Sequence, residues 1–283
     1  PNSVTSIGRD AFSSCSKLTS VHITDLAAWC RIKFITTSSQ YRYSSNPLDN
    51  AQHLYMNGAE ITDLVIPNGV TSIGCGAFSN CTGLKSVTIP SSVTTIERGS
   101  FCSCSNLESV TIPNSVTSIE DGAFEYCSGV VTINMGNSVT TIGNNAFAYC
   151  SNLVSVNIPN SVTSIGYNAF NSCSSLVSVT VPDNVQSIGG SAFSGCNKLM
   201  SVSIGSGLKS LSGNIFGGTN SIASIKVSTE NNVYDSRNNC NAIIETSTNT
   251  LISGCKNTVI PNSVTSIGSW AFYGSNGLTS VTI

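Results

Sequence analysis

The sequence has 283 residues, and 9% of them are charged, against roughly a quarter in ordinary globular proteins. A formal net charge of -2 provides no basic patch for nucleic acid or for an acidic membrane surface, and no apolar run is long enough for a membrane-spanning helix. Hydrophobic residues make up 40% of the chain, which is enough to bury a substantial core.

A repeat of 23 residues organises the chain, and one unit approximates I-P-N-S-V-T-S-I-G-x-x-A-F-x-x-C-S-x-L-x-S-V-x. Its phenylalanines recur at Phe78, Phe101, Phe124, Phe147, Phe170, Phe193 and Phe216. Outer copies contain Phe12 and Phe272. A unit this short cannot close a core alone, so we expect the copies to stack and bury a common core.

Each unit predicts three short segments. L-x-S-V-x-I, as in Leu153, Val156 and Ile158, is the strand signature of leucine-rich repeats. V-T-S-I-G predicts a second β segment that ends in a bend, and A-F-x-x-C predicts a short helical or 3₁₀ turn. We therefore predict one right-handed leucine-rich-repeat solenoid over residues 1–283, with nine coils, a parallel β-sheet, and buried phenylalanine and cysteine columns throughout.

Two insertions interrupt the repeats, at residues 24–60 and 228–254. The first predicts a helix over residues 25–30, capped by Thr24 or Asp25, and a hairpin around Asn57-Gly58. The second predicts a hairpin that pairs residues 242–245 with 250–252. Degenerate strand segments at residues 61–66 and 255–260 are expected to re-enter the stack and to bring the number of strands to about eleven.

The twelve cysteines mostly follow the repeat. Seven of them stand three residues after a phenylalanine, at Cys15, Cys81, Cys104, Cys127, Cys150, Cys173 and Cys196. At this position a free cysteine serves as a small buried hydrophobe. Parallel stacking holds neighbouring Cβ atoms about 5 Å apart, beyond the roughly 3.5–4.5 Å of a disulfide, so we predict reduced thiols.

Catalytic and metal-binding patterns have little support. A nucleophilic hydrolase needs a base beside its serine or cysteine, and the two histidines, His22 and His53, are interpreted as surface residues. Carboxylates are too few and too irregularly placed to form an acid/base pair. Cys75, Cys81, Cys102 and Cys104 fall on adjacent coils, but two of them point into the apolar core, which disfavours zinc. We predict no enzyme, no metal and no cofactor.

The outward strand positions are the candidate binding residues. The third and fifth positions form polar columns that include Ser155, Asn157, Ser178 and Thr180. The second position forms an apolar stripe on five consecutive coils, made of Val131, Val154, Val177, Met200 and Ala223. Such a stripe is typical of a partner site. Two alternatives remain open, because partial burial at the strand entrance would make the stripe structural and small polar residues also simply keep a sheet soluble.

The pattern resembles the BspA-type, or Treponema-type, bacterial leucine-rich repeats. The resemblance rests on the repeated I-P-N-S-V-T-S-I-G and A-F-x-x-C-S-x-L, and on the insertion sequences D-L-A-A-W-C and Y-D-S-R-N-N-C-N-A-I-I-E-T. It implies export to the bacterial cell surface and adhesion to host proteins such as fibronectin and fibrinogen. Residues 1–4 repeat residues 261–264 from inside a unit, so we expect a fragment of a longer exported protein.

The leading interpretation is therefore a non-enzymatic, extracellular or cell-surface module that binds a host or extracellular-matrix protein. One alternative is a structural spacer that holds another domain away from the cell. Another is a carbohydrate-binding module that uses Trp29, Tyr41, Tyr43 and Tyr55 of the first insertion as a stacking platform. In that case the aromatic side chains must be exposed, whereas packing over the end coils would argue against it.

Overall fold

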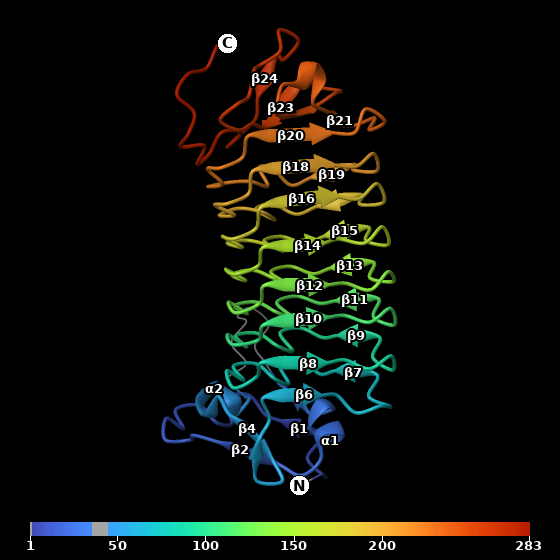
Figure 1. Ribbon diagram of the computed structural model, residues 1–283, viewed down its shortest axis with the longest axis vertical. Coiled ribbons are helices and arrows are strands. Elements are labelled where there is room, and N and C mark those ends of the chain that lie inside the picture. Colours follow the sequence, from blue (N-terminus) through green and yellow to red (C-terminus); the bar gives the residue numbers. More distant parts are fainter. Residues whose placement is uncertain (1, 36–44) are drawn as a thin grey trace.

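The computed structural model describes residues 2–35 and 45–283. The chain forms a parallel β-solenoid of about nine coils with about 23 residues each (Figure 1). The coils stack along one axis, and the N- and C-terminal segments lie at opposite ends of the stack. The predicted solenoid of 23-residue coils is confirmed.

A first ladder of parallel strands forms from the L-x-S-V-x-I segments. Its strands are β6 (Asp63–Val65), β8 (Ser86–Thr88), β10 (Ser109–Thr111), β12 (Thr132–Asn134), β14 (Ser155–Asn157), β16 (Ser178–Val181), β18 (Ser201–Ile204) and β20 (Ser224–Val227). Strand pairing stays in register with the repeat, so that Val110 faces Ile133 and Val179 faces Val202. These branched side chains point inward and are buried, as alternation along a strand requires.

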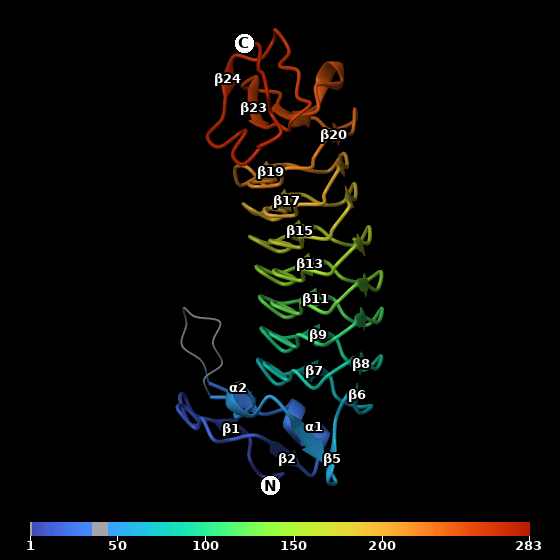
Figure 2. The same cartoon turned by 60° about the vertical axis from the view of Figure 1, so that its left-hand side comes forward.

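A second ladder forms from the V-T-S-I segments, on another side of each coil (Figure 2). Its strands are β7 (Ser72–Ile73), β9 (Thr95–Ile96), β11 (Ser118–Ile119), β13 (Thr141–Ile142), β15 (Ser164–Ile165), β17 (Ser187–Ile188) and β19 (Ser210–Leu211). Together with β1 (Ser6–Ile7) and β24 (Ser266–Ile267) in the outer copies, they account for all nine V-T-S-I elements.

The A-F-x-x-C segments form turns, and no helix occurs in them among the described residues. Individual hydrogen bonds of the 3₁₀ type do occur in these turns, as from Cys81 N–H to the Phe78 carbonyl at 3.1 Å. Alternate N–H groups instead donate to the next coil, as from Phe78 N–H to the Ser100 carbonyl at 2.8 Å. Because inter-coil bonds take these donors, the segment becomes a third hydrogen-bonded side of the solenoid.

The core is a column of stacked phenylalanine rings. Neighbouring rings from Phe78 to Phe193 have centroids 5.2–5.4 Å apart, and the last pair, Phe193 and Phe216, is 6.2 Å apart. The column is buried along all seven central coils. In the outer copies the prediction of burial was wrong, because Phe12 and Phe272 are half-buried and Cys15 is exposed where only one neighbouring coil covers each.

The cysteine column has a role beyond filling space. Five of the seven thiols donate to the carbonyl of the phenylalanine on the preceding coil, with Cys150 Sγ to Phe124 O at 3.3 Å and Cys173 Sγ to Phe147 O at 3.2 Å. Cys104, Cys127 and Cys196 make the same bond. Thr219 replaces cysteine in the column, and its hydroxyl donates to Phe193 O at 3.0 Å. The feature that the repeats of this chain share at this position is therefore a small side chain with a donor. The buried thiols of the column, from Cys81 to Cys196, are in no disulfide.

The first insertion packs against the first regular turn. It contains the elements α1 (Leu26–Cys30), β3 (Lys33–Phe34), α2 (Leu48–Ala51), β4 (Leu54–Met56) and β5 (Ala59–Glu60). The strand β2 (Val21–Ile23) belongs to the repeat copy before the insertion. Asp25 caps α1 by accepting a bond from Ala28 N–H at 3.0 Å, as predicted. The predicted hairpin pairs β4 with β5, and both Asn57 and Gly58 have positive φ, as a type I′ turn requires.

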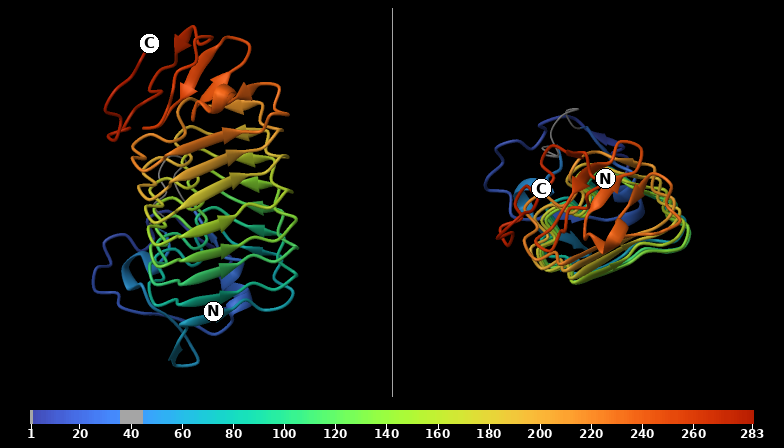
Figure 3. Two further views of the ribbon diagram at one scale, coloured as in Figure 1. Left: turned by 45° about the horizontal axis from the view of Figure 1, so that its top comes forward. Right: turned by 90° about the horizontal axis from the view of Figure 1, so that it is seen from above.

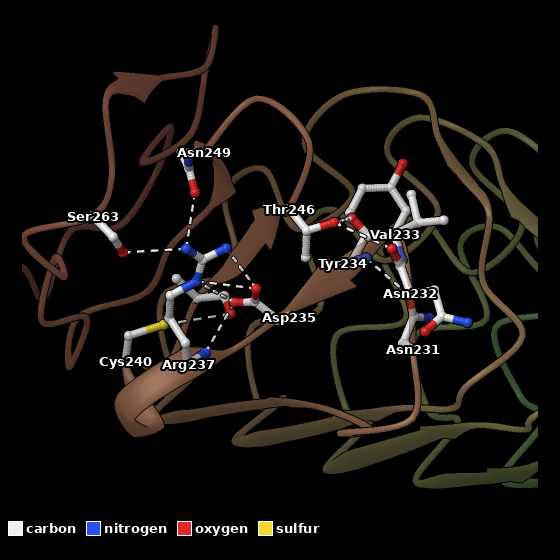
Figure 4. Close-up of polar contacts among 11 residues, drawn as sticks. Asn231, Asn232, Val233, Tyr234, Asp235, Arg237, Cys240, Thr246, Asn249 and Ser263 are labelled. Atoms are coloured by element: carbon white, nitrogen blue, oxygen red, sulfur yellow. Dashed lines mark hydrogen bonds and ion pairs between the residues drawn. The ribbon is translucent and has the colours of Figure 1, made fainter.

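The second insertion joins the last regular coil to the final repeat. It contains β21 (Tyr234–Asp235), the 3₁₀ helix η1 (Arg237–Asn239), β22 (Ile243–Glu245) and β23 (Thr250–Ser253). β22 and β23 form the predicted antiparallel hairpin. Arg237 pairs with Asp235 at 2.6 Å and donates to Asn249 at 2.9 Å and to Ser263 at 3.2 Å, so one guanidinium ties the insertion to the final repeat (Figure 4).

The expected count of about eleven stacked strands was wrong. Residues 61–66 do re-enter the first ladder, as β6, but residues 255–260 form no strand. Thr258 N–H donates to the Cys255 carbonyl at 3.1 Å and Cys255 N–H donates to Thr258 Oγ1 at 2.7 Å, which closes this segment into a turn. None of the helices in the described part of the chain is long and apolar enough to cross a bilayer.

Replacing Cys150 tests whether the column needs its donor. Cys150→Val removes the donor to the Phe124 carbonyl, and we expect it to lower the free energy of unfolding by about 1–3 kcal/mol, the penalty for an unpaired buried polar group. Cys150→Thr has the same shape as the valine variant and keeps a donor, as Thr219 does, so it is the matched control. Equal urea denaturation midpoints for the two variants would contradict the donor role.

The buried thiols of the column should make the free energy of unfolding fall at alkaline pH. Burial raises the pKa of Cys81 and Cys196 to about 12, and raises the pKa of Cys150 and Cys173 well above the ordinary value of 9.0. The unfolded chain therefore releases these protons first as the pH rises above about 9. We expect stability to be fully present below pH 9 and to fall toward pH 12, as measured by urea denaturation. Threonine at positions 150 and 173 should flatten this decline.

Candidate functional site

The polar columns lie on the outward face of the first ladder. Ser155, Asn157, Ser178 and Thr180 are all exposed, on β14 and β16. The pairing places Asn157 beside Asn134 and Thr180 beside Ser203, so each column continues from coil to coil within two sheets, one that ends at β14 and one that begins at β16. The strands of the first ladder stack side by side along the molecule (Figure 3). Hydroxyl and amide groups are consequently presented in rows at the spacing of one coil.

A shallow groove with a volume of about 780 Å³ runs over these columns. It extends from β12 to β20, and its polar walls include the four predicted polar residues of β14 and β16. Among the lining residues, all within the described part of the chain, only Asp183 and Lys226 are charged. Asp183 Oδ1 already accepts bonds from the backbone N–H and the hydroxyl of Ser206, at 2.8 and 3.1 Å. The groove is therefore a nearly neutral hydrogen-bonding surface.

The apolar stripe lies immediately before the strands, beside the groove and outside its lining. Its backbone is hydrogen-bonded from coil to coil, with Val154 N–H to Val131 O at 3.1 Å and Val177 N–H to Val154 O at 3.2 Å. Val131 and Val154 are each 44% exposed and Met200 is 53% exposed. Val177 and Ala223 are half-buried. The nine predicted residues thus form one continuous surface, made of a polar groove and an apolar margin.

The histidines lie in the region of the first insertion. His22 stacks on Tyr55 with ring centroids 4.9 Å apart and contacts Ser20 Oγ at 3.1 Å. His53 Nδ1 lies 2.6 Å from Glu60 Oε1. Within residues 2–35 and 45–283, no three histidine, cysteine or acidic side chains gather closely enough to hold a metal ion.

Burial raises the pKa of the Cys102 thiol to about 12, so at neutral pH this group is protonated.

Trp29 is a structural anchor, which argues against its use as a sugar-stacking platform. It is 5% exposed, its ring contacts Phe34 edge-on, and its indole N–H donates to the Ala77 carbonyl at 2.9 Å. Tyr55 is half-buried against His22. Tyr41 and Tyr43, the other members of the predicted aromatic platform, lie outside the described residues. The tryptophan instead joins the insertion to the first regular turn.

Exposed aromatic residues that the repeat analysis overlooked lie on the turn side. Tyr126 and Tyr149 are 47% and 40% exposed and stack on one another. They occupy a column where other coils have asparagine, serine or glycine. That break in column chemistry is the sequence signal that would have singled them out.

Both the fold and the sequence place the chain in one class, the bacterial leucine-rich-repeat solenoids. A sequence model of the BspA type leucine rich repeat region matches residues 1–40, 51–177 and 243–283, in 6 copies. These segments make up more than half of the chain, which belongs to this family.

Solved structures with the same fold include a T. pallidum leucine rich repeat protein. It is 31% identical, with a TM-score of 0.50, over 53% of this chain and 73% of that one. A leucine-rich repeat protein from Eubacterium ventriosum is 22% identical, with a TM-score of 0.50, over 71% of this chain and 48% of that one. A leucine rich cell surface protein from Faecalibacterium prausnitzii is 26% identical, with a TM-score of 0.41, over 81% and 78%. No curated protein matches the chain.

Threonine substitutions test whether the stripe is surface or core. Val154→Thr changes a side chain that is 44% exposed, so we expect a change in unfolding free energy within about 0.5 kcal/mol. Val179→Thr makes the same chemical change at a position that is 2% exposed, and burying its hydroxyl should cost about 1–3 kcal/mol. Thermal and urea denaturation measure both. Equal losses would show that the stripe is part of the core.

Proposed function

We propose that the chain is a non-enzymatic binding module at the bacterial cell surface, and that it binds other proteins through the outward face of the first ladder. The observation that carries the proposal is the exposure of apolar side chains on consecutive coils, in register, beside a neutral groove. Membership of the BspA-type family supports a protein-interaction role. A host or extracellular-matrix protein is the partner class that we propose.

The size of the apolar stripe favours weak attachment through repeated contacts. Full burial of a valine or methionine side chain contributes about 1.5–3 kcal/mol, so the remaining exposure of Val131, Val154 and Met200 offers about 3 kcal/mol in total. Association costs about 4–15 kcal/mol in lost freedom of motion. The stripe alone is therefore insufficient, and the polar groove and several molecules acting together must supply the difference. That behaviour suits adhesion, in which many copies bind at once.

The charge of the groove adds an expectation about salt. Because only Asp183 and Lys226 carry charge there, coulombic attraction contributes little to partner binding. Binding through this face should consequently change little with ionic strength, unlike binding through a basic or acidic patch. The face also lies on the regular coils, so partner binding need not order a flexible loop.

Paired aspartate substitutions test the face. The double variant Val154→Asp/Val177→Asp places two charges on the stripe, and we expect binding to immobilised fibronectin or fibrinogen to weaken by about tenfold or more, because each charge must be desolvated. Thr163→Asp/Gln186→Asp adds the same charges to exposed positions on the second ladder and should bind like the wild type. Biolayer interferometry measures affinity, and thermal denaturation verifies folding.

Several outcomes would overturn this assignment. Unchanged affinity in the stripe variant would remove this face from consideration. A lowered thermal midpoint in that variant alone would show that the stripe is structural. Failure of the wild-type chain to bind either matrix protein, when displayed in many copies on beads, would contradict the proposed partner class.

A further inference from the structure

One column on the turn side requires an unusual backbone conformation. The second residue after each phenylalanine has φ between 58° and 74° in seven consecutive coils, at Asn80, Ser103, Tyr126, Tyr149, Ser172, Gly195 and Gly218. Glycine and asparagine tolerate this left-handed region, whereas a bulky side chain is strained in it. Two adjacent coils nevertheless place tyrosine there.

The stacking of the two tyrosines does not offset this strain. Their ring centroids are 4.4 Å apart and the planes are inclined by 5°. Such a pair contributes about 0.5–1.5 kcal/mol, whereas the left-handed conformation costs about 1–2 kcal/mol for each residue that has a side chain. Tyr126 and Tyr149 also remain 47% and 40% exposed. Ser103 and Ser172 adopt the same conformation, so the backbone of this column does not require an aromatic residue, and the exposed tyrosine pair calls for another explanation.

A buried carboxyl group lies next to the pair. Glu125 is 6% exposed, and its Oε2 atom has no hydrogen-bond partner. The corresponding residues on the adjacent coils are Cys102 and Ala148, which are small and uncharged. Burial without a partner disfavours the carboxylate and raises the pKa of Glu125 to about 7. Two unfavourable residues thus stand side by side in one coil, a concentration typical of functional sites.

The surroundings of this carboxyl group are uniformly negative or neutral. Glu125 directly precedes Tyr126 in the chain, and the pKa of the Tyr126 phenol is raised by burial, by Tyr149 and by Glu125. The Cys102 thiol faces Glu125 from the preceding coil. No lysine or arginine of the described residues shifts the pKa of Glu125. In the tyrosine column the pair is flanked by Ser103 and Ser172, and Tyr126 and Tyr149 remain exposed.

We propose that Tyr126, Tyr149 and Glu125 form a second binding site, on the turn side of the solenoid, for the cationic side chain of an arginine or lysine on a partner polypeptide. The guanidinium or ammonium group stacks on a tyrosine face, where the ring quadrupole attracts it, and pairs with the carboxylate. One ligand group thereby explains both the strained aromatic pair and the unpartnered carboxyl group. This site is separate from the face of the first ladder and does not depend on it.

The charge of Glu125 makes binding depend on pH. Below about pH 7 the carboxyl group is protonated and offers no charge, and above it the carboxylate attracts the cation. The facing groups, the Cys102 thiol and the Tyr126 phenol, both have pKa values raised by burial and remain neutral across this range. Affinity for a cation should therefore increase several-fold between about pH 6 and about pH 8.

A peptide titration of the full chain tests the site. A tri-arginine peptide is added while the tyrosine ring signals are followed by NMR, and a tri-citrulline peptide of nearly the same shape but no charge is the control ligand. We expect saturable shifts at Tyr126 and Tyr149 with the arginine peptide, and binding of the citrulline peptide that is weaker by about tenfold or more. Equal affinity for both peptides, or no saturable shift, would overturn the proposal.

Two test variants and two control variants locate the binding. Tyr126→Ser/Tyr149→Ser installs the residue found at positions 103 and 172, and Glu125→Gln removes the charge while keeping the shape; each should weaken the arginine peptide by about tenfold and leave the thermal midpoint unchanged or raised. Tyr167→Ser, at another exposed tyrosine, and Val154→Asp/Val177→Asp should both bind the peptide normally. Undiminished binding by the first two variants, or a collapsed midpoint in both, would show that the cluster is structural.

Discussion

Six consecutive central coils are each joined to the preceding one by a hydrogen bond from a buried side-chain donor to the carbonyl of a stacked phenylalanine. The thiol of Cys150 makes this bond to Phe124, and the hydroxyl of Thr219 makes it to Phe193. The bond lies inside the core, where an unpaired carbonyl would be costly, and it is possible only when donor and acceptor are one coil apart. It therefore favours a spacing of 23 residues along the central coils, from Phe78 to Thr219.

A fixed spacing has consequences at the surface. When the inner columns are held in register, the outer columns are in register as well, so hydroxyl, amide and apolar side chains form continuous rows without any specific contact between them. The groove over β12–β20 and the stripe through Val154 both arise in this way. Extra residues are tolerated only where the stack is already interrupted, and there single side chains, Trp29 and Arg237, join each insertion to the adjacent coils.

The first ladder and the turn side of the solenoid differ in which amino-acid substitutions they tolerate. On the first ladder, any small or β-branched polar residue suits the backbone, so changes between serine, threonine and asparagine carry little structural penalty. On the turn side, the left-handed column admits glycine and asparagine readily and tyrosine only with strain. A departure from the repeat is therefore more informative on the turn side, and Glu125-Tyr126 is the clearest departure there.

The sequence alone determined the solenoid, the nine coils, both hairpins and the start of the first helix, because each depends on local pattern and on a period that survives both insertions, and the structure chose Asp25 over Thr24 as the helix cap. It also separated inward from outward positions. Contacts across coils were decided only by the tertiary structure: the cysteines became donors, residues 255–260 turned back, and Trp29 was buried. The volume of the groove and the lack of a hydrogen-bond partner at Glu125 Oε2 were likewise decided only by the tertiary structure. A repeat pattern reports which way a side chain points, whereas its hydrogen-bond partner and its exposure depend on atoms of the neighbouring coil.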